Sequence, residues 1–396
     1  FILRNALRAE VARRKADAVN VFVAADYESS YRLKVLISAD GERALTAESY
    51  SLLLWDVRNR LQIAPLKRIK CCLEGVALSS DGTLVAYSLR NAFPLRHGIG
   101  VTNIATRTIM LQSELPKANK PVEARLIRFL PSNRGLLIGD TIGRLIFQDI
   151  DGNPARIVGE HLPDLKDASI YGRMEGLDIS PDGRYAVTVT SYDGQVKIWD
   201  IAAGRLVRSV NVYKPTTGLN DKGGLDHDNP ILVAFDSAGR TVTVVQKPGT
   251  FSNGPGVNRI NRIDIANGTV KSVDPGGSII TAAASPKRDV IAISVSRSKE
   301  QIGATGNRPV GGGPWPKPTA DEGALPQDSI DVYDLENLRL LGRVATVNKI
   351  WAITDFGRTA LVGQAKNRSD DGMMAAADLV AGTFAPFART NQRTIP

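Results

Sequence analysis

Three adjacent residues, Asp226, His227 and Asp228, form the one cluster of metal-ligand type in this chain. Carboxylate and imidazole groups are common metal ligands, and a hard cation such as calcium prefers oxygen donors. Adjacent side chains of an extended segment point in opposite directions, so a turn is needed to bring all three to one ion. Amide and carboxylate oxygens lie nearby in Asn220, Asp221 and Asn229. A polar loop without a metal is the alternative, and we favour it.

Other catalytic patterns are absent from the sequence. It has no Gly-x-Ser-x-Gly elbow, no His-Glu-x-x-His helix and no phosphate-binding Gly-rich loop after a strand. The glycine-rich run GATGNRPVGGGP at residues 303–314 has no Lys and no strand-to-helix setting. Three histidines leave little room for a Ser-His-Asp arrangement. We therefore expect no catalytic residues and no cofactor.

The charge distribution argues against a nucleic-acid partner. The net charge is +9, of which about +5 comes from residues 1–18 and 389–396, and the remaining charges are well mixed. Aromatic residues make up 6% of the chain, whereas a nucleic-acid binder gathers basic residues on one face among stacking aromatics. We expect a protein or peptide partner and no nucleic acid.

Cysteine usage and hydropathy say little about the compartment. Cys71 and Cys72 are adjacent, a spacing that strains a disulfide and matches no zinc ribbon. No apolar run approaches the 18 residues of a membrane-spanning helix, so we expect membrane attachment only through a segment upstream of Phe1. Nothing demands an oxidising compartment, which slightly favours the cytoplasm. The oligomeric state is left open.

A repeated unit sets the architecture, and its best copy is SPDGRYAVTVTSYDGQVKIWD at residues 180–200. Two strand-like alternations there flank Ser191–Gly194, and a tight turn precedes them. The tight turn recurs, in steps of about 50 residues, at Gly41, Gly82, Asn133, Gly183, Gly239, Arg288 and Gly357. A second motif, an Asp or Asn before an apolar residue and a turn, recurs at Asp56, Asn103, Asp149, Asp200, Asp264, Asp334 and Asp378.

Seven units of four antiparallel strands predict an all-β chain folded as a seven-bladed β-propeller. Each sheet would cover the faces of its neighbours, so all seven units form one domain. We expect a basic helix or linker at residues 1–18, the propeller at 19–388 and a tail at 389–396. Residues 19–25 (VNVFVAA) are predicted as the outer strand of the last blade. TFAPF at 383–387 competes for that place but contains Pro386.

The units resemble WD repeats, most clearly at Trp199-Asp200 and Trp55-Asp56. In that family a Gly-His pair precedes the first strand, and its His joins a buried hydrogen-bond network with a turn Asp. The corresponding region here reads YGRMEGLDIS, without His. The resemblance is therefore to a divergent, bacterial-looking WD-repeat-like propeller in which that network is largely missing. Such propellers often follow kinase, peptidase or nucleotide-switch domains in larger chains.

The strand order predicts which face of the propeller binds. The first-to-second and third-to-fourth turns are short and lie on one face, while insertions gather in the second-to-third loops and inter-blade links on the other. The insertions are residues 90–98, 213–229, 247–258, 297–327 and 366–372.

We therefore predict a non-catalytic interaction or regulatory module with a partner on the inserted loops. The candidate contacts are Phe93, Arg96, Phe251 and Trp315, of which Trp315 lies between two prolines. Trp315 pinning its loop to the propeller is an alternative to contact with a partner. The rival functions are a hydrolase or lactonase-like enzyme with a metal near the channel mouth, and a small-molecule sensor.

Overall fold

The structure is a computed structural model that describes part of the chain. The described residues are 34–37, 43–48, 51–56, 61–68, 75–92, 95–118, 122–161, 174–190, 192–212, 228–248, 258–285, 287–298, 326–345, 349–353, 359–363, 374–378 and 383–386. Strands dominate these residues. The helix or linker expected over 1–18 and the tail over 389–396 lie outside them.

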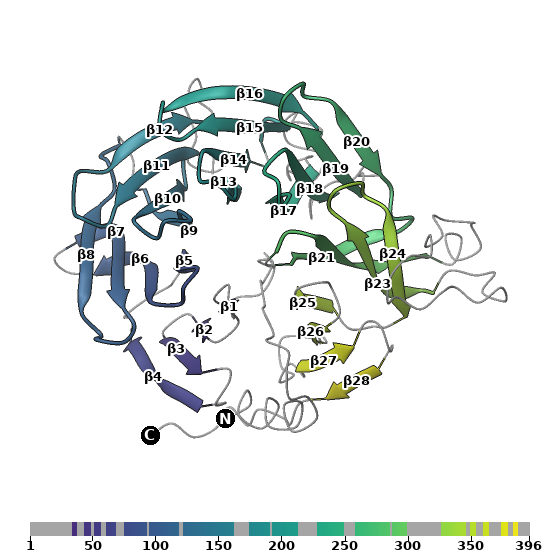
Figure 1. Cartoon of the computed structure of the whole chain (residues 1–396), viewed down its shortest axis with the longest axis horizontal. Coiled ribbons are helices and arrows are strands. Elements are labelled where there is room, and N and C mark those ends of the chain that lie inside the picture. The colour runs from purple at the N-terminus through teal and green to yellow at the C-terminus, as the bar shows by residue number, and fades with distance from the viewer. Residues whose placement is uncertain are drawn as a thin grey trace, which may run out of the picture. The chain divides into compact units, whose positions relative to one another are not determined.

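Seven four-stranded antiparallel sheets make up the described fold (Figure 1), and we number them 1 to 7 in chain order. In each, the four strands follow one another as a meander. Sheets 1 to 3 are β1 (Lys34–Ile37), β2 (Arg43–Glu48), β3 (Ser51–Asp56), β4 (Leu61–Arg68); β5 (Val76–Leu78), β6 (Leu84–Ala92), β7 (Leu95–Asn103), β8 (Ile109–Glu114); and β9 (Ala124–Phe129), β10 (Gly135–Asp140), β11 (Arg144–Asp149), β12 (Arg156–Glu160).

Sheets 4 to 7 repeat the same order. They are β13 (Met174–Ile179), β14 (Tyr185–Thr190), β15 (Gln195–Asp200), β16 (Arg205–Asn211); β17 (Asp228–Phe235), β18 (Thr241–Pro248), β19 (Arg259–Asp264), β20 (Val270–Val273); β21 (Ser278–Ala284), β22 (Val290–Ser296), β23 (Asp328–Asp334), β24 (Leu340–Ala345); and β25 (Lys349–Ile353), β26 (Thr359–Gly363), β27 (Met374–Asp378), β28 (Thr383–Pro386).

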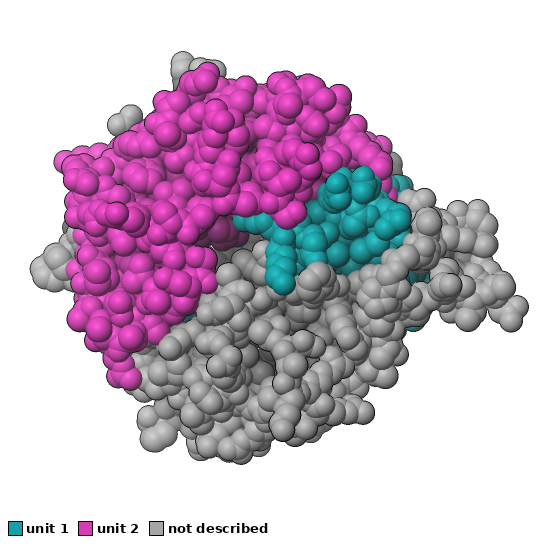
Figure 2. All heavy atoms as spheres, in the orientation of Figure 1, with its two compact units in different colours: residues 1–46, 53–65, 274–396 teal, residues 47–52, 66–273 magenta. Residues whose placement is uncertain are grey.

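The chain divides into two compact units, coloured separately in Figure 2. Unit 1 comprises residues 1–46, 53–65 and 274–396, and it holds sheets 6 and 7. Unit 2 comprises residues 47–52 and 66–273 and holds sheets 2 to 5. Sheet 1 contributes residues to both units.

The first repeated turn has the backbone that the sequence predicts. Gly82, Gly183 and Gly239 have φ between 64° and 73°, a region that L side chains rarely adopt and glycine adopts freely. Asn133 and Arg288 stand at the same place with φ of 57° and 60°. In all five turns this residue donates its backbone N–H to the carbonyl three residues earlier. The two remaining positions, Gly41 and Gly357, lie outside the described residues.

The second repeated motif ends the third strand of every sheet, from Asp56 in β3 to Asp378 in β27. In sheets 2 to 6 its side chain accepts backbone hydrogen bonds from the following turn. Asp264 Oδ1 accepts from Ala266 and Asn267, at 2.9 and 3.1 Å, and Asn103 Oδ1 accepts from Ala105 and Thr106. A short acceptor side chain satisfies donors that the tight turn leaves free, which explains the recurrence of Asp and Asn.

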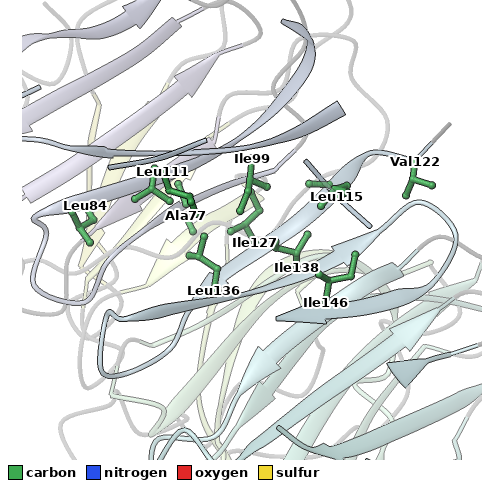
Figure 3. Close-up of a cluster of buried hydrophobic side chains, with 13 residues drawn as sticks. Ala77, Leu84, Ile99, Leu111, Leu115, Val122, Ile127, Leu136, Ile138 and Ile146 are labelled. Carbon is green, nitrogen blue, oxygen red and sulfur yellow. The ribbon is translucent and has the colours of Figure 1, made fainter. Parts of the chain in front are cut away.

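Apolar side chains between neighbouring sheets form the core of unit 2. One cluster joins sheets 2 and 3 and includes Ile99, Ile127 and Leu136 (Figure 3). The next joins sheets 3 and 4, where Trp199 packs with Leu137 and Leu145. A third joins sheets 4 and 5. Both faces of sheets 3 and 4 are therefore covered, which is how stacked four-stranded sheets bury their apolar surface.

The fourth strands are the outer edges of the sheets (Figure 1) and carry the exposed apolar residues of unit 2. Ile109 and Met110 on β8 are 53% and 48% exposed, and Leu206 and Val207 on β16 are 43% and 39% exposed. The pairing register shifts beside both pairs. Such bulges twist an edge strand and hinder pairing with another chain.

Two expectations about strands are wrong. Residues 90–98 were expected to be a loop, but Arg90–Ala92 continue β6 and Leu95–Gly98 begin β7, paired as far as Ala92 with Leu95. The outer strand of sheet 7 is β28, not residues 19–25, which lie outside the described residues. Pro386 is tolerated in β28 because the strand is an edge and its missing N–H can face outward.

Candidate interaction face and its buried polar supports

The meander places the second-to-third turn of a sheet and its links to neighbouring sheets at one end, which we call the loop-bearing end. The strands extend further toward this end in some sheets than in others. In sheet 2 both β6 and β7 have nine residues, and in sheet 5 both β17 and β18 have eight. The corresponding strands of sheets 3 and 4 have six. In sheet 2 the second-to-third hairpin therefore extends further at this end, with pairing as far as Ala92 and Leu95. In sheet 5 the longer pair is the first and second strands, which reach this end where Asp228 pairs with Pro248.

A buried hydrogen-bonded chain lies at the loop-bearing end of sheet 4. Trp199 Nε1 donates to Thr188 Oγ1 at 2.8 Å, and Thr188 Oγ1 lies 2.9 Å from His161 Nδ1. His161 Nε2 lies 3.1 Å from Asp193 Oδ1. The indole can only donate and the carboxylate can only accept. The Thr188 hydroxyl therefore donates to Nδ1, and Nε2 donates to Asp193.

His161 is held neutral in this chain. Burial lowers the pKa of His161, and the hydrogen bond with Asp193 offsets that effect only in part. The Lys197 ammonium donates to the His161 carbonyl oxygen and lies 3.6 Å from Asp193 Oδ2. The charges of Lys197 and Asp193 therefore neutralise each other, and the imidazole beside them is neutral. This arrangement favours a structural role for the cluster over proton transfer.

Sheet 4 is an exception to the expectation that the WD-repeat network is largely missing. The region before β13 has no His, but His161 follows β12 directly, and residues 162–173 separate it from the first strand. The ring of Trp199 packs on Gly159, where an added Cβ would lie 2.2 Å from Cζ3. The readable signal was the sequence RIVGEH, in which His ends a fourth strand instead of preceding a first one.

An arginine takes the equivalent place in sheet 3. Arg144 Nε donates to Asp140 Oδ2 at 2.6 Å, while Nη1 and Nη2 donate to the carbonyl oxygens of Lys117 and Pro116. The two carbonyls belong to the link from sheet 2, and Arg144 begins β11 directly after the second-to-third turn. The Asp140 carboxylate also accepts the Ile142 and Arg144 backbone N–H groups. Burial nevertheless raises the pKa of Asp140.

Sheet 6 has a larger polar cluster of the same kind. Arg297 donates to the carbonyl oxygens of Pro275, in the link, and Pro326, beside β23. Its Nη2 also donates to Asp331 Oδ2 at 2.9 Å. Arg343 on β24 binds the same carboxylate through Nε and Nη2, at 2.8 and 2.7 Å.

These clusters share one function in the fold. In sheets 3, 4 and 6 a buried polar side chain joins the incoming link to the second-to-third turn: Arg144, His161 and Arg297 respectively. In sheet 5, Asn261 bonds Gln246 and Ser272 across three strands instead. Satisfied buried networks fix one arrangement of the groups they join. The loop-bearing ends therefore rest on rigid bases. Sequence reasoning missed all three supports because their partners are backbone carbonyls or distant residues.

Three of the four predicted contact residues lie outside the part of the chain that the structure describes. Phe93, Phe251 and Trp315 lie outside the described residues, and Arg96 is placed as the second residue of β7. Of the predicted metal ligands, Asp228 begins β17, and Asp226 and His227 lie outside the described residues. These assignments stay predictions. Within the described ranges, no group of three His, Cys, Asp or Glu side chains is placed to hold a metal, and no helix is long and apolar enough to span a membrane.

Comparison with known proteins identifies the fold. The β-propeller domain of Cps50 (Swd1) from Myceliophteria thermophila has a TM-score of 0.55 at 10% identity, covering 93% of this chain and all of that one. A structure of the mitotic checkpoint complex gives 0.55 at 14%, covering 95% and 96%. Kuenenia stuttgartiensis hydrazine synthase gives 0.54 at 15%, covering 96% and 97%. The chain has a WD-repeat-like β-propeller fold.

No family model and no curated protein matches the sequence. Identities of 10–15% show the propeller fold alone. The local evidence agrees with it, since sheet 4 has the Trp, Thr, His and Asp network that WD-repeat resemblance implies. Sheets 3 and 6 keep the propeller meander but replace that network with arginine-centred supports.

Proposed function

We propose that the chain is a non-catalytic protein-interaction propeller of seven blades, closed as one ring, that binds a protein or peptide on the face formed by its loop-bearing ends. We further propose that it acts as a regulatory or scaffold module within a larger multidomain chain. The contacts proposed are Phe93, Arg96, Phe251 and Trp315. Aromatic and arginine side chains dominate protein interfaces because they bury large areas at low entropic cost.

One observation carries this proposal most directly. Rigid buried supports lie under the loop-bearing ends of sheets 3, 4 and 6, where Arg144, His161 and Arg297 tie links to turns. The opposite ends carry short turns with one repeated backbone geometry. Repeat scaffolds build binding surfaces from loops that vary in length and sequence on a rigid base. The hydrolase and sensor alternatives have no comparable support among the described residues.

The test is partner capture by the purified chain from a lysate of its source, read by mass spectrometry. Phe93→Ala and Trp315→Ala, separately and together, are expected to reduce capture of a specific partner at least about tenfold, the effect of losing a hot-spot side chain. Arg96→Ala is expected to have a smaller effect if its charge lies at the rim of the interface.

Matched controls lie away from the proposed face. Met110→Ala removes an exposed apolar side chain from an outer strand, and Arg184→Ala removes an exposed guanidinium near a first-to-second turn. Both are expected to leave capture unchanged, and thermal unfolding checks that every variant is folded. Equal capture by the Phe93→Ala/Trp315→Ala double variant and the wild type would exclude this face.

A further inference from the structure

The polar cluster of sheet 6 carries an excess of buried positive charge. The side chains of Arg297 and Asp331 are 0% exposed, and that of Arg343 is 9% exposed. Two guanidinium groups therefore share one carboxylate. Elsewhere in the described part of the chain the buried pairs balance one to one: Arg144 with Asp140, Arg125 with Glu175, and Lys197 with Asp193.

The Asp331 carboxylate has no capacity for further donors. Its Oδ1 accepts from Ser329 Oγ at 2.7 Å and from Arg343 Nε at 2.8 Å. Its Oδ2 accepts from Arg297 Nη2 at 2.9 Å and Arg343 Nη2 at 2.7 Å. A carboxylate offers about four acceptor sites. Any remaining donor near Asp331 therefore needs a different acceptor.

Two buried hydrogen-bond donors in this cluster have no acceptor. Arg297 Nε and the Tyr333 hydroxyl have no hydrogen-bond partner, and Tyr333 is 0% exposed. Tyr333 lies two residues from Asp331 on the same face of β23, and Arg343 is paired directly opposite Asp331. Burial raises the pKa of Tyr333, and the Asp331 charge adds to that effect. The phenol therefore keeps its proton and remains a donor.

Excess positive charge and unpaired donors around one saturated carboxylate favour a negatively charged ligand. A buried charge without a counter-ion is costly, and a buried unpaired N–H or O–H adds to that cost. An anion that accepts from both donors would remove both penalties. The site is nine-tenths or more buried, which restricts the ligand to a small ion.

We propose that Arg297, Arg343 and Tyr333 form a binding site for a small inorganic anion of the size of chloride. The ion would accept hydrogen bonds from Arg297 Nε and Tyr333 Oη and neutralise the charge that Asp331 leaves uncompensated. The site lies beside the base of the second-to-third loop of sheet 6, since Arg297 also bonds the Pro326 carbonyl. Anion binding would thus stiffen the base of that loop.

The experiment is thermal unfolding of the full chain at constant ionic strength while sodium gluconate is replaced by sodium chloride. Gluconate is too large for a site this buried, so the midpoint should rise with chloride and saturate. Bromide should substitute, and its anomalous signal in a crystal should lie beside Tyr333. Tyr333→Phe removes one donor without changing the charge, and it should weaken the apparent chloride affinity about tenfold.

Arg343→Gln removes the excess charge and should abolish the chloride dependence whether or not the variant is less stable. The matched control is Tyr87→Phe, which removes the hydroxyl of a 1% exposed tyrosine that bonds Thr102 instead. That control should keep the wild-type chloride response. A midpoint independent of chloride in the wild type, or the same chloride titration in the wild type and Tyr333→Phe, would overturn the proposal.

Discussion

At the scale of single residues, the informative positions are buried polar side chains that join segments distant in sequence. Thr188 is the clearest case, because its hydroxyl accepts from Trp199 and donates to His161. The contact with His161 could not be predicted from the spacing within sheet 4, since residues 162–173 separate His161 from β13. The sequence contains the residues of the network but not the fold that brings them together.

Thr188→Val is expected to lower the free energy of unfolding of the chain by about 2–6 kcal/mol. Valine keeps the shape of threonine, but the indole N–H and the imidazole nitrogen would each be left buried without a partner, at about 1–3 kcal/mol apiece. Urea denaturation followed by Trp fluorescence measures this loss. Trp199→Phe and the double variant complete a cycle, and strict additivity of the two losses would show that the contact is not formed.

At the scale of elements, the strands and turns could be predicted well from the sequence because they depend on local chemistry. The positive φ of Gly183 and the acceptor side chain of Asp264 are properties of a four-residue turn. The outer strand of sheet 7 could not be predicted. The choice between residues 19–25 and 383–387 depends on which segment reaches the edge of a distant sheet, and the rule against Pro applies less strictly to an edge.

The first repeated turn gives a prediction at this scale. Gly183→Ala is expected to lower the free energy of unfolding by about 1–2 kcal/mol, because a Cβ is strained at φ +73° and would lie 3.3 Å from Pro131. Gly183→Asn should cost less, since Asn tolerates this region. Gly152→Ala is the matched control, because it separates backbone strain from the contact with Pro131. Gly152 also has a positive φ, +92°, but no atom lies within 4 Å of an added Cβ. Equal losses for Ala and Asn at position 183 would contradict a backbone origin.

At the scale of the whole molecule, the repeat predicts a fold and leaves the partner undetermined. The second repeated motif ends the third strand of every sheet, from Asp56 to Asp378. This regularity made it possible to predict the propeller from the sequence. The binding residues have no such regularity. Phe93, Phe251 and Trp315 are bulky residues in segments predicted as insertions. Bulky contact residues are a property of interfaces in general and not of one partner.

Ring closure by all seven sheets is the last prediction. In a closed ring each sheet covers its neighbours, as the apolar clusters on both faces of sheets 3 and 4 show within unit 2. Deleting residues 346–396 removes sheet 7 and would expose the faces that it covers. The loss should be on the order of 5 kcal/mol or more, which approaches the whole stability of a domain.

Thermal unfolding of the shortened chain should therefore show no cooperative transition above room temperature. Deleting residues 389–396, the expected tail, should change nothing. An unchanged cooperative transition after the larger deletion would mean that the sheets form an open array.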